Sequence, residues 1–129
     1  MTKKTISPHV SIYTFPIAAI SSITNRVTGL FLTTGLLVAP PFYLYKECWP
    51  SSRGESPPPI PPYVKNVLIF IASFSITYHS LGGIRHIAYD KYPSLINNKF
   101  SRDSSVYMFF LASLSAVSFV KGMYDSRDN

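Results

Sequence analysis

Apolar residues in this chain are concentrated in long runs that contain no charged side chain. The runs are Val27–Tyr45, Asn66–Ile84 and Ser104–Val120, and lysine, arginine and aspartate gather at their edges. A helix that crosses a membrane needs about 20 apolar residues, with a range of about 17–25. The pattern therefore predicts an all-α protein with three transmembrane helices.

Local signals near the ends of the runs give expected boundaries for the helices. We expect them at about residues 17–38, 63–89 and 103–124. Proline is favoured in a first turn, so Pro16 or Ile17 is the expected start of the first helix. Pro40 and Pro41 are expected to end or kink it. Asp103 is the candidate N-cap of the third helix.

The remaining segments complete a single integral-membrane domain over residues 1–129. Residues 1–16 predict an ordered arm at the membrane surface, because Pro8 and Pro16 disfavour helix before them. Residues 46–62 are rich in proline and predict an extended loop in water on the opposite side. Lysine and arginine are somewhat more frequent on the N-terminal side, which favours an N-terminus in the cytoplasm or the mitochondrial matrix.

Composition agrees with a membrane protein and excludes other classes. Only 14% of the residues are charged and 47% are hydrophobic, whereas about 25% charged residues are usual in soluble domains. The net charge of +6 does not indicate nucleic-acid binding, because the basic residues form no stripe. A single cysteine, Cys48, excludes an internal disulfide. The start of the chain is too poor in arginine for a transit peptide, so we expect that one was removed or never existed.

The most informative residue of the second apolar run is His79. An ionisable residue inside a membrane span is costly, which makes it a functional candidate. His79 and His86 share a helical face about 10 Å apart along the axis, too far to share one metal ion. Gly82 and Gly83 leave room for a flat ring to approach the backbone. These features favour a haem-binding helix, in which one histidine binds iron and Arg85, His86 or both reach acidic groups at the ring edge.

Ser22 and Arg26 stand four residues apart and share a face of the first helix. Two interpretations are open. Arg26 is either an anchor that snorkels to the membrane surface, or it forms with Ser22 a hydrogen-bonding pair for an oxygen-bearing ligand or an acidic cofactor edge. The expected topology brings this pair, Arg85 and His86 to a similar depth, with His79 about 10 Å deeper.

The histidines also limit how a haem could be ligated. A six-coordinate haem needs two axial ligands on opposite sides of the ring. His86 lies on the helix of His79, and His9 lies outside the spans. If both ligands are histidines, the second must come from another chain, and this protein is a subunit.

Two motifs in this chain resemble a known family. They are Ser7-Pro8-His9 and Ile12-Tyr13 followed by Ser22-Ile23-Thr24-Asn25-Arg26-Val27-Thr28-Gly29, and His79 followed by Gly83-Ile84-Arg85-His86 and Asp90. In this order they resemble the large cytochrome b membrane-anchor subunit of succinate dehydrogenase, respiratory complex II. The third helix carries no signature.

The resemblance implies a set of site residues. His79 would be the axial ligand of the haem iron. Arg26, Arg85 and His86 would lie near the haem propionates. Ser22 and Arg26 would line the ubiquinone site, with Ile23 as its apolar wall. The family usually has histidine at position 25 and often tryptophan at position 89, where this chain has Asn25 and Tyr89. The departures leave the haem potential in question.

The resemblance also implies cofactors, partners and location. A second, smaller anchor would share one haem b, and iron–sulfur and flavoprotein subunits would dock on the inner face. The complex, not this chain alone, would oxidise succinate and reduce ubiquinone. Two alternatives are a structural anchor without functional haem and the anchor of a quinol:fumarate reductase. The N-terminal motif favours the mitochondrial inner membrane with the N-terminus in the matrix, and the bacterial inner membrane is the alternative.

Overall fold

The computed structural model describes residue 12 and residues 14–48 and 60–128. Its elements are α1 (Ile17–Cys48), α2 (Pro62–Lys91), the short 3₁₀ helix η1 (Pro93–Leu95) and α3 (Asn98–Asp128), and these described ranges contain no strand. The prediction of an all-α protein is confirmed. Most of the expected N-terminal arm and of the proline-rich loop lies outside the described residues.

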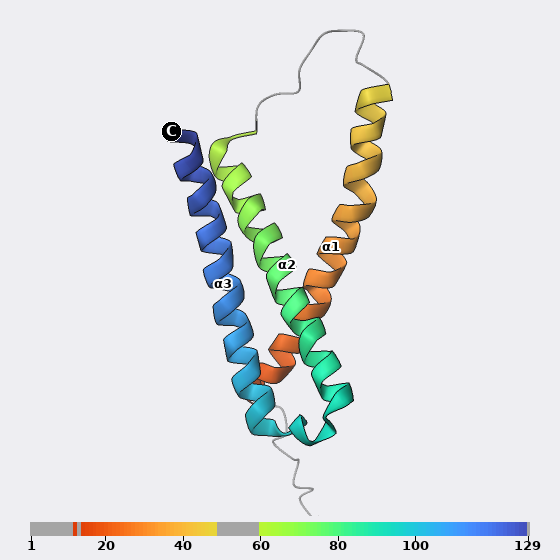
Figure 1. Ribbon diagram of the computed structural model, residues 1–129, viewed down its shortest axis with the longest axis vertical. Coiled ribbons are helices and arrows are strands. Elements are labelled where there is room, and N and C mark those ends of the chain that lie inside the picture. The colour runs from red at the N-terminus through yellow and green to blue at the C-terminus, as the bar shows by residue number, and fades with distance from the viewer. Residues whose placement is uncertain (1–11, 13, 49–59, 129) are drawn as a thin grey trace, which may run out of the picture.

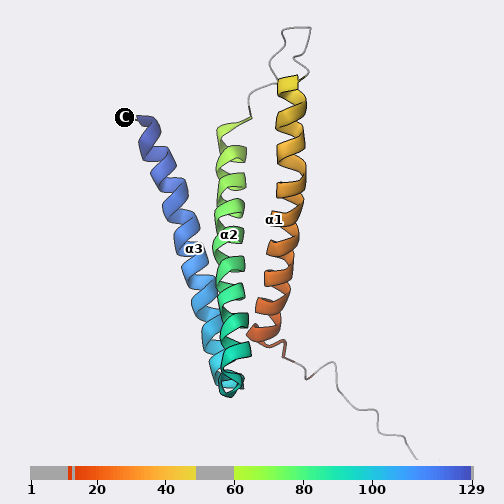
Figure 2. The ribbon, with the colours of Figure 1, turned by 45° about the vertical axis from the view of Figure 1, so that its right-hand side comes forward.

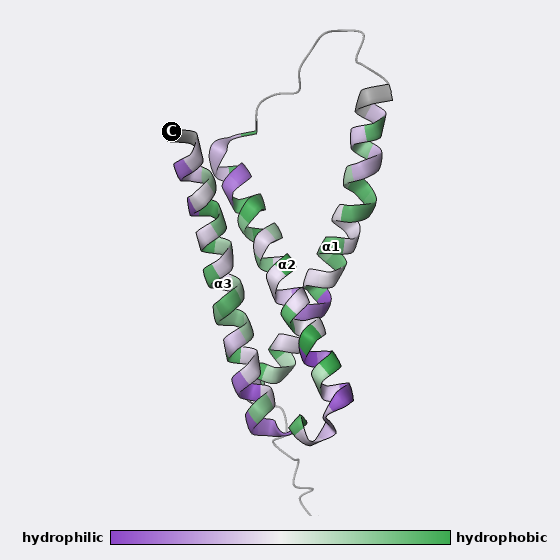
Figure 3. Ribbon diagram, in the orientation of Figure 1, coloured by the Kyte–Doolittle hydropathy of each residue, from purple (hydrophilic) through white to green (hydrophobic). Residues whose placement is uncertain are grey.

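Each of the three α-helices is long and apolar enough to cross a membrane. The candidate spans are Ile17–Tyr45, Pro62–Lys91 and Asn98–Ser126. Hydrophilic segments gather at the lower end of the bundle, near the upper ends of α2 and α3, and where α1 crosses α2 (Figure 3). The first two locations suit a membrane protein, because charged groups are stable at the interfaces with water. The third is unusual, because it lies away from both ends of the bundle.

The chain runs up, down and up, so the start of α1, the end of α2 and the start of α3 lie at one end (Figure 1). This agrees with the predicted topology. Two views together show that the helices meet at this end and splay apart toward the other (Figures 1 and 2). As a consequence, every described side chain of α1 from Thr33 to Tyr45 is exposed.

The first helix extends ten residues beyond its predicted end at residue 38, since α1 continues to Cys48 with Pro40 and Pro41 inside it. A proline removes one backbone donor and crowds the preceding turn. Such prolines are tolerated in transmembrane helices, where local adjustments satisfy the freed carbonyl groups. The predicted end was therefore wrong, and residues 46–48 of the expected loop are helical.

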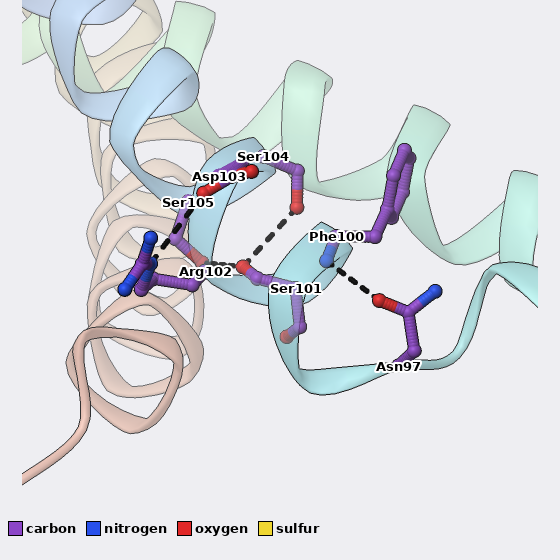
Figure 4. Close-up of polar contacts among 7 residues, drawn as sticks. All are labelled: Asn97, Phe100, Ser101, Arg102, Asp103, Ser104 and Ser105. Atoms are coloured by element: carbon purple, nitrogen blue, oxygen red, sulfur yellow. Dashed lines mark hydrogen bonds and ion pairs between the residues drawn. The ribbon is translucent and has the colours of Figure 1, made fainter.

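The third helix also begins earlier than predicted, at Asn98 instead of residue 103. Asn97 caps it, since its Oδ1 accepts a 2.8 Å hydrogen bond from the Phe100 N–H (Figure 4). The Asn97 carbonyl also accepts a hydrogen bond from the Ser101 N–H. The assignment of Asp103 as N-cap was wrong. Asp103 lies inside the helix and pairs with Arg102 at 3.4 Å.

The core lies along the seam between α2 and α3. Tyr78 of α2 is fully buried against Met108 and Ala112, with Phe74 and Phe109 packed beside it. Thr77 and Ser115 share a 2.7 Å hydrogen bond across the same seam. Lipid provides no hydrophobic driving force between membrane helices, so their association depends on close packing. Small residues permit that close approach. Ser115 thus contributes to the packing of α3 against α2.

Candidate cofactor site at the crossing of α1 and α2

His79 is exposed on α2, and its ring turns toward α1. Its Nδ1 lies 3.0 Å from the main-chain oxygen of Asn25. A carbonyl oxygen can only accept, so Nδ1 must carry the proton. The neutral imidazole then has an unprotonated Nε2. No hydrogen bond to Nε2 occurs within the described part of the chain. His79 therefore offers an unprotonated Nε2 on an exposed residue of α2.

Two glycines allow α1 and α2 to approach at this point. A Cβ atom at Gly29 of α1 would lie 2.7 Å from the Cε1 of His79. A Cβ atom at Gly82 of α2 would overlap the side-chain oxygen of Asn25. Each helix thus places a side chain on the glycine of the other. Gly82 was expected to make room for a flat ring, but Asn25 fills that room, whereas the space at Gly83 is open.

A buried polar pair also joins α1 and α2 at this crossing. The Tyr78 hydroxyl donates a 2.8 Å hydrogen bond to the Oγ of Ser21, and the main-chain oxygen of Ser21 lies 3.3 Å away. Both side chains are completely buried. Tyr78 precedes His79, and Ser21 precedes Ser22 of the predicted quinone site. The pair therefore fixes the backbone beside two candidate functional residues.

The predicted quinone-site residues lie on the N-terminal third of α1. Ser22 is half-buried, Arg26 is exposed and Ile23 is 50% exposed. Neither Ser22 nor Arg26 forms a hydrogen bond with its side chain anywhere in the described ranges. Their donors are consequently free to meet a ligand from outside this chain, at the end of the bundle where α1 begins.

Arg85 and His86 point in different directions. Arg85 turns to α3, where its Nη1 donates a 3.0 Å hydrogen bond to the Oγ of Ser105, and its guanidinium lies 6.0 Å from the ring centre of Tyr89. Its Nε is buried without a partner in the described structure. His86 is exposed on the face of His79, two turns further along α2. The structure therefore groups His86 with His79 and separates Arg85 from both.

Arg85 also lines a cavity of about 530 Å³ between α2 and α3. The walls are mostly apolar and include Leu81, Phe100 and Met108, while Asp103 and Ser104 supply further polar groups. Within the described residues, no group of three or more histidine, cysteine, aspartate or glutamate side chains could hold a metal ion. The described residues therefore offer single histidines, and no cluster, as possible metal ligands.

Sequence reasoning assigned no role of their own to Ser21, Tyr78, Gly29 and Ser105. A signal was present for part of this set. Ser21, Asn25, Thr28 and Gly29 recur at helical spacing and form one face of α1, distinct from the face of Ser22 and Arg26. The structure shows that this small, polar face is the one that packs on α2. Nothing in the sequence indicated that Ser105 would pair with Arg85.

The chain is similar to a known family and to known proteins. A family described as succinate dehydrogenase/fumarate reductase transmembrane subunit matches residues 1–120. The chain is 28% identical over 85 residues to the succinate dehydrogenase cytochrome b556 subunit of Paracoccus denitrificans, covering 66% of this chain and 65% of that protein. It is 30% identical over 95 residues to the mitochondrial succinate dehydrogenase cytochrome b560 subunit of Dictyostelium discoideum, covering 66% of this chain and 44% of that protein. The chain thus matches less than two thirds of the length of either relative.

Proposed function

Because this chain belongs to the family of succinate dehydrogenase/fumarate reductase transmembrane subunits, we propose that it is the cytochrome b anchor of a succinate:ubiquinone oxidoreductase, complex II. The observation that carries the proposal is the hydrogen bond from His79 Nδ1 to the Asn25 carbonyl. It leaves Nε2 unprotonated on an exposed residue, as a haem ligand requires.

His79 would hold the iron of haem b. Bound haem would supply a carrier that takes up or gives one electron at a time. A second, smaller anchor subunit would donate another ligand and share the haem.

Arg26 and His86 are suited to the haem propionates, since both are exposed and lie toward the end where α1 begins and α2 ends. A guanidinium and an imidazole can each donate hydrogen bonds to a carboxylate. Arg85 could reach a propionate only after its hydrogen bond to Ser105 breaks.

Ubiquinone would bind against Ser22, Ile23 and Arg26. Its carbonyl oxygens accept hydrogen bonds and gain negative charge on reduction. The Ser22 hydroxyl and the Arg26 guanidinium would donate hydrogen bonds to one of these carbonyl oxygens. They would stabilise its developing charge without reorganisation of the site. Ile23 would contact the apolar part of the quinone ring. In this role the chain orients the quinone, while the electrons come from other subunits.

The partners and the location follow from the same family. The iron–sulfur and flavoprotein subunits would dock at the end of the bundle where α1 begins, close to Ser22 and Arg26. The exposed apolar length of α1 from Thr33 to Tyr45 would face the second anchor or lipid. We place the chain in the mitochondrial inner membrane with its N-terminus in the matrix, or in the bacterial inner membrane in the same orientation.

Affinity purification of the tagged full chain from its native membrane tests this function. We expect a flavoprotein, an iron–sulfur protein and a second small membrane protein to co-purify, and the preparation to reduce ubiquinone with succinate. A preparation that holds these partners but favours fumarate reduction by quinol would support the alternative enzyme. Purification of the chain without them would contradict both.

A further inference from the structure

The Asn25 carbonyl lies in the middle of α1 and yet accepts a hydrogen bond from another helix, which is unusual. Such an oxygen already accepts the backbone N–H of the residue four positions on, here Gly29. The Thr28 hydroxyl also donates to it at 3.0 Å, and His79 adds a further donor at 3.0 Å from a different helix. A donor from outside can reach a helical carbonyl only if the surrounding side chains leave it uncovered.

Gly29 is the residue that uncovers it. In an α-helix a side chain leans toward the N-terminus and covers the preceding turn, so a side chain at position 29 would lie over the Asn25 carbonyl. Gly29 has no side chain, and the His79 ring occupies the space, with its Cε1 only 2.7 Å from where a Cβ would stand. Its Nδ1 is thereby aimed at the carbonyl.

Gly82 sets the approach of the helices from the other side. The Asn25 side chain lies over Gly82, in a space that a Cβ atom would fill. This contact brings the α1 backbone close enough for Nδ1 to reach it. The two glycines thus act on the same hydrogen bond through different atoms, Gly29 by admitting the ring and Gly82 by admitting Asn25.

We infer that the Asn25 carbonyl, uncovered by Gly29, is the positioning group for the haem ligand, so that Gly29 and Thr28 of α1 control haem retention and potential through His79. The inference rests on the proposed function, in which His79 binds iron. The carbonyl keeps the proton on Nδ1, holds the ring in one orientation and leaves Nε2 unprotonated. Groups of this kind typically change metal affinity by about 10- to 100-fold when lost.

The first test compares Gly29→Ala with Gly35→Ala in the purified complex. Gly35 is the matched control, because it lies in the same helix and a Cβ there meets nothing within 4 Å. Haem is counted per co-purified flavoprotein, and the paramagnetic resonance of the oxidised haem is recorded. We expect Gly29→Ala to retain haem about 10-fold more weakly and to shift the resonance, whereas Gly35→Ala matches wild type. Equal haem content and equal resonance in both variants would overturn the inference.

A milder pair keeps the test decisive if Gly29→Ala does not assemble. Thr28→Val removes one donor from the Asn25 carbonyl, and Thr24→Val removes the same kind of bond from the carbonyl of Ile20, at 2.9 Å, which no histidine contacts. A carbonyl with fewer donors accepts more strongly from His79 and makes the ligand more electron-rich. The midpoint potential of the haem should therefore fall in Thr28→Val and stay constant in Thr24→Val. Equal potentials in the two variants would overturn the inference.

The same series separates this inference from the proposed function. If His79→Ala keeps its full haem content, the proposed function fails, and the inference fails with it. If His79→Ala loses haem while Gly29→Ala and Thr28→Val behave like their controls, only the positioning role fails.

Discussion

The hydroxyl of Tyr78 in α2 donates a 2.8 Å hydrogen bond to Ser21 Oγ in α1, and neither side chain is reached by solvent. In an apolar surrounding each group would be costly to leave without a partner. The pair therefore holds α1 against α2 one residue away from both His79 and Ser22. The residues that pack the two helices are thus the direct chain neighbours of the candidate functional residues.

Tyr78→Phe should weaken this crossing. Loss of one buried hydrogen bond costs about 1 kcal/mol, with more if Ser21 stays unpaired. We expect a lower thermal unfolding temperature of the detergent-solubilised complex. Tyr107→Phe is the matched control, since Tyr107 is 67% exposed on α3. An equal unfolding temperature for the two variants would show that the Tyr78 hydroxyl contributes nothing to stability.

Arg26→Ala should impair quinone reduction more than succinate oxidation. A charge-assisted hydrogen bond contributes about 1.5–3 kcal/mol, which corresponds to a loss of about 10- to 150-fold in kcat/KM for ubiquinone. Ser22→Ala should lower the same constant by a smaller factor. The reduction of a soluble dye by the flavoprotein should stay at the wild-type rate. Arg102→Ala serves as control, because Arg102 is also exposed near the end of the bundle.

Unchanged quinone kinetics in an assembled Arg26→Ala complex would remove Arg26 from the site. That result would leave the other interpretation of this residue, an anchor that snorkels to the membrane surface.

Arg85 and Ser105 should prove to be coupled in stability. The arginine donates to Ser105 at 3.0 Å across the α2–α3 seam. We expect Arg85→Ala and Ser105→Ala each to lower the unfolding temperature, and the double variant to lose less than the sum. Hydrogen bonds between membrane helices average about 0.6 kcal/mol in such cycles. Strict additivity, together with loss of haem from Arg85→Ala alone, would instead assign Arg85 to the propionates.

The α2–α3 seam should not accept a larger side chain at Ala112. Ala112 is fully buried beside Tyr78 and Met108. Overpacking a filled interior typically costs about 1–3 kcal/mol, so Ala112→Leu should reduce the yield of assembled complex. Ser113→Leu is the control, because Ser113 is the next residue of the same helix and is exposed. Similar yields from both variants would mean that the seam is looser than its buried alanine indicates.

Helix number, order and topology could be predicted from the sequence, because they depend on the length of apolar runs and on the positions of polar segments. The ends of α1 and α3 could not. Pro40 and Pro41 normally end a helix in water, but in α1 the helix continues through them to Cys48. The N-cap of α3 is Asn97. Asparagine and aspartate are both favoured at an N-cap, so the residue type did not distinguish Asn97 from Asp103.

The candidate site was predictable only in part. His79 stands out because an ionisable residue in a membrane span is rare. The rotation of α1 about its own axis was not predictable. Ser22 with Arg26 and Ser21 with Asn25 define two polar faces, and either could have packed on α2. Contact with Tyr78 and Gly82 decides which face turns to α2. The direction of Arg85 depends likewise on Ser105, a residue of another helix.

Haem binding by His79 can be measured in a reduced-minus-oxidised absorbance spectrum of the purified complex, with His79→Ala beside wild type. Ser80→Ala, at the exposed neighbouring position, is the control for substitution in this turn. We predict a b-type haem band in wild type and Ser80→Ala that is lost in His79→Ala. A band of full height in His79→Ala, or no band in wild type, would contradict the account.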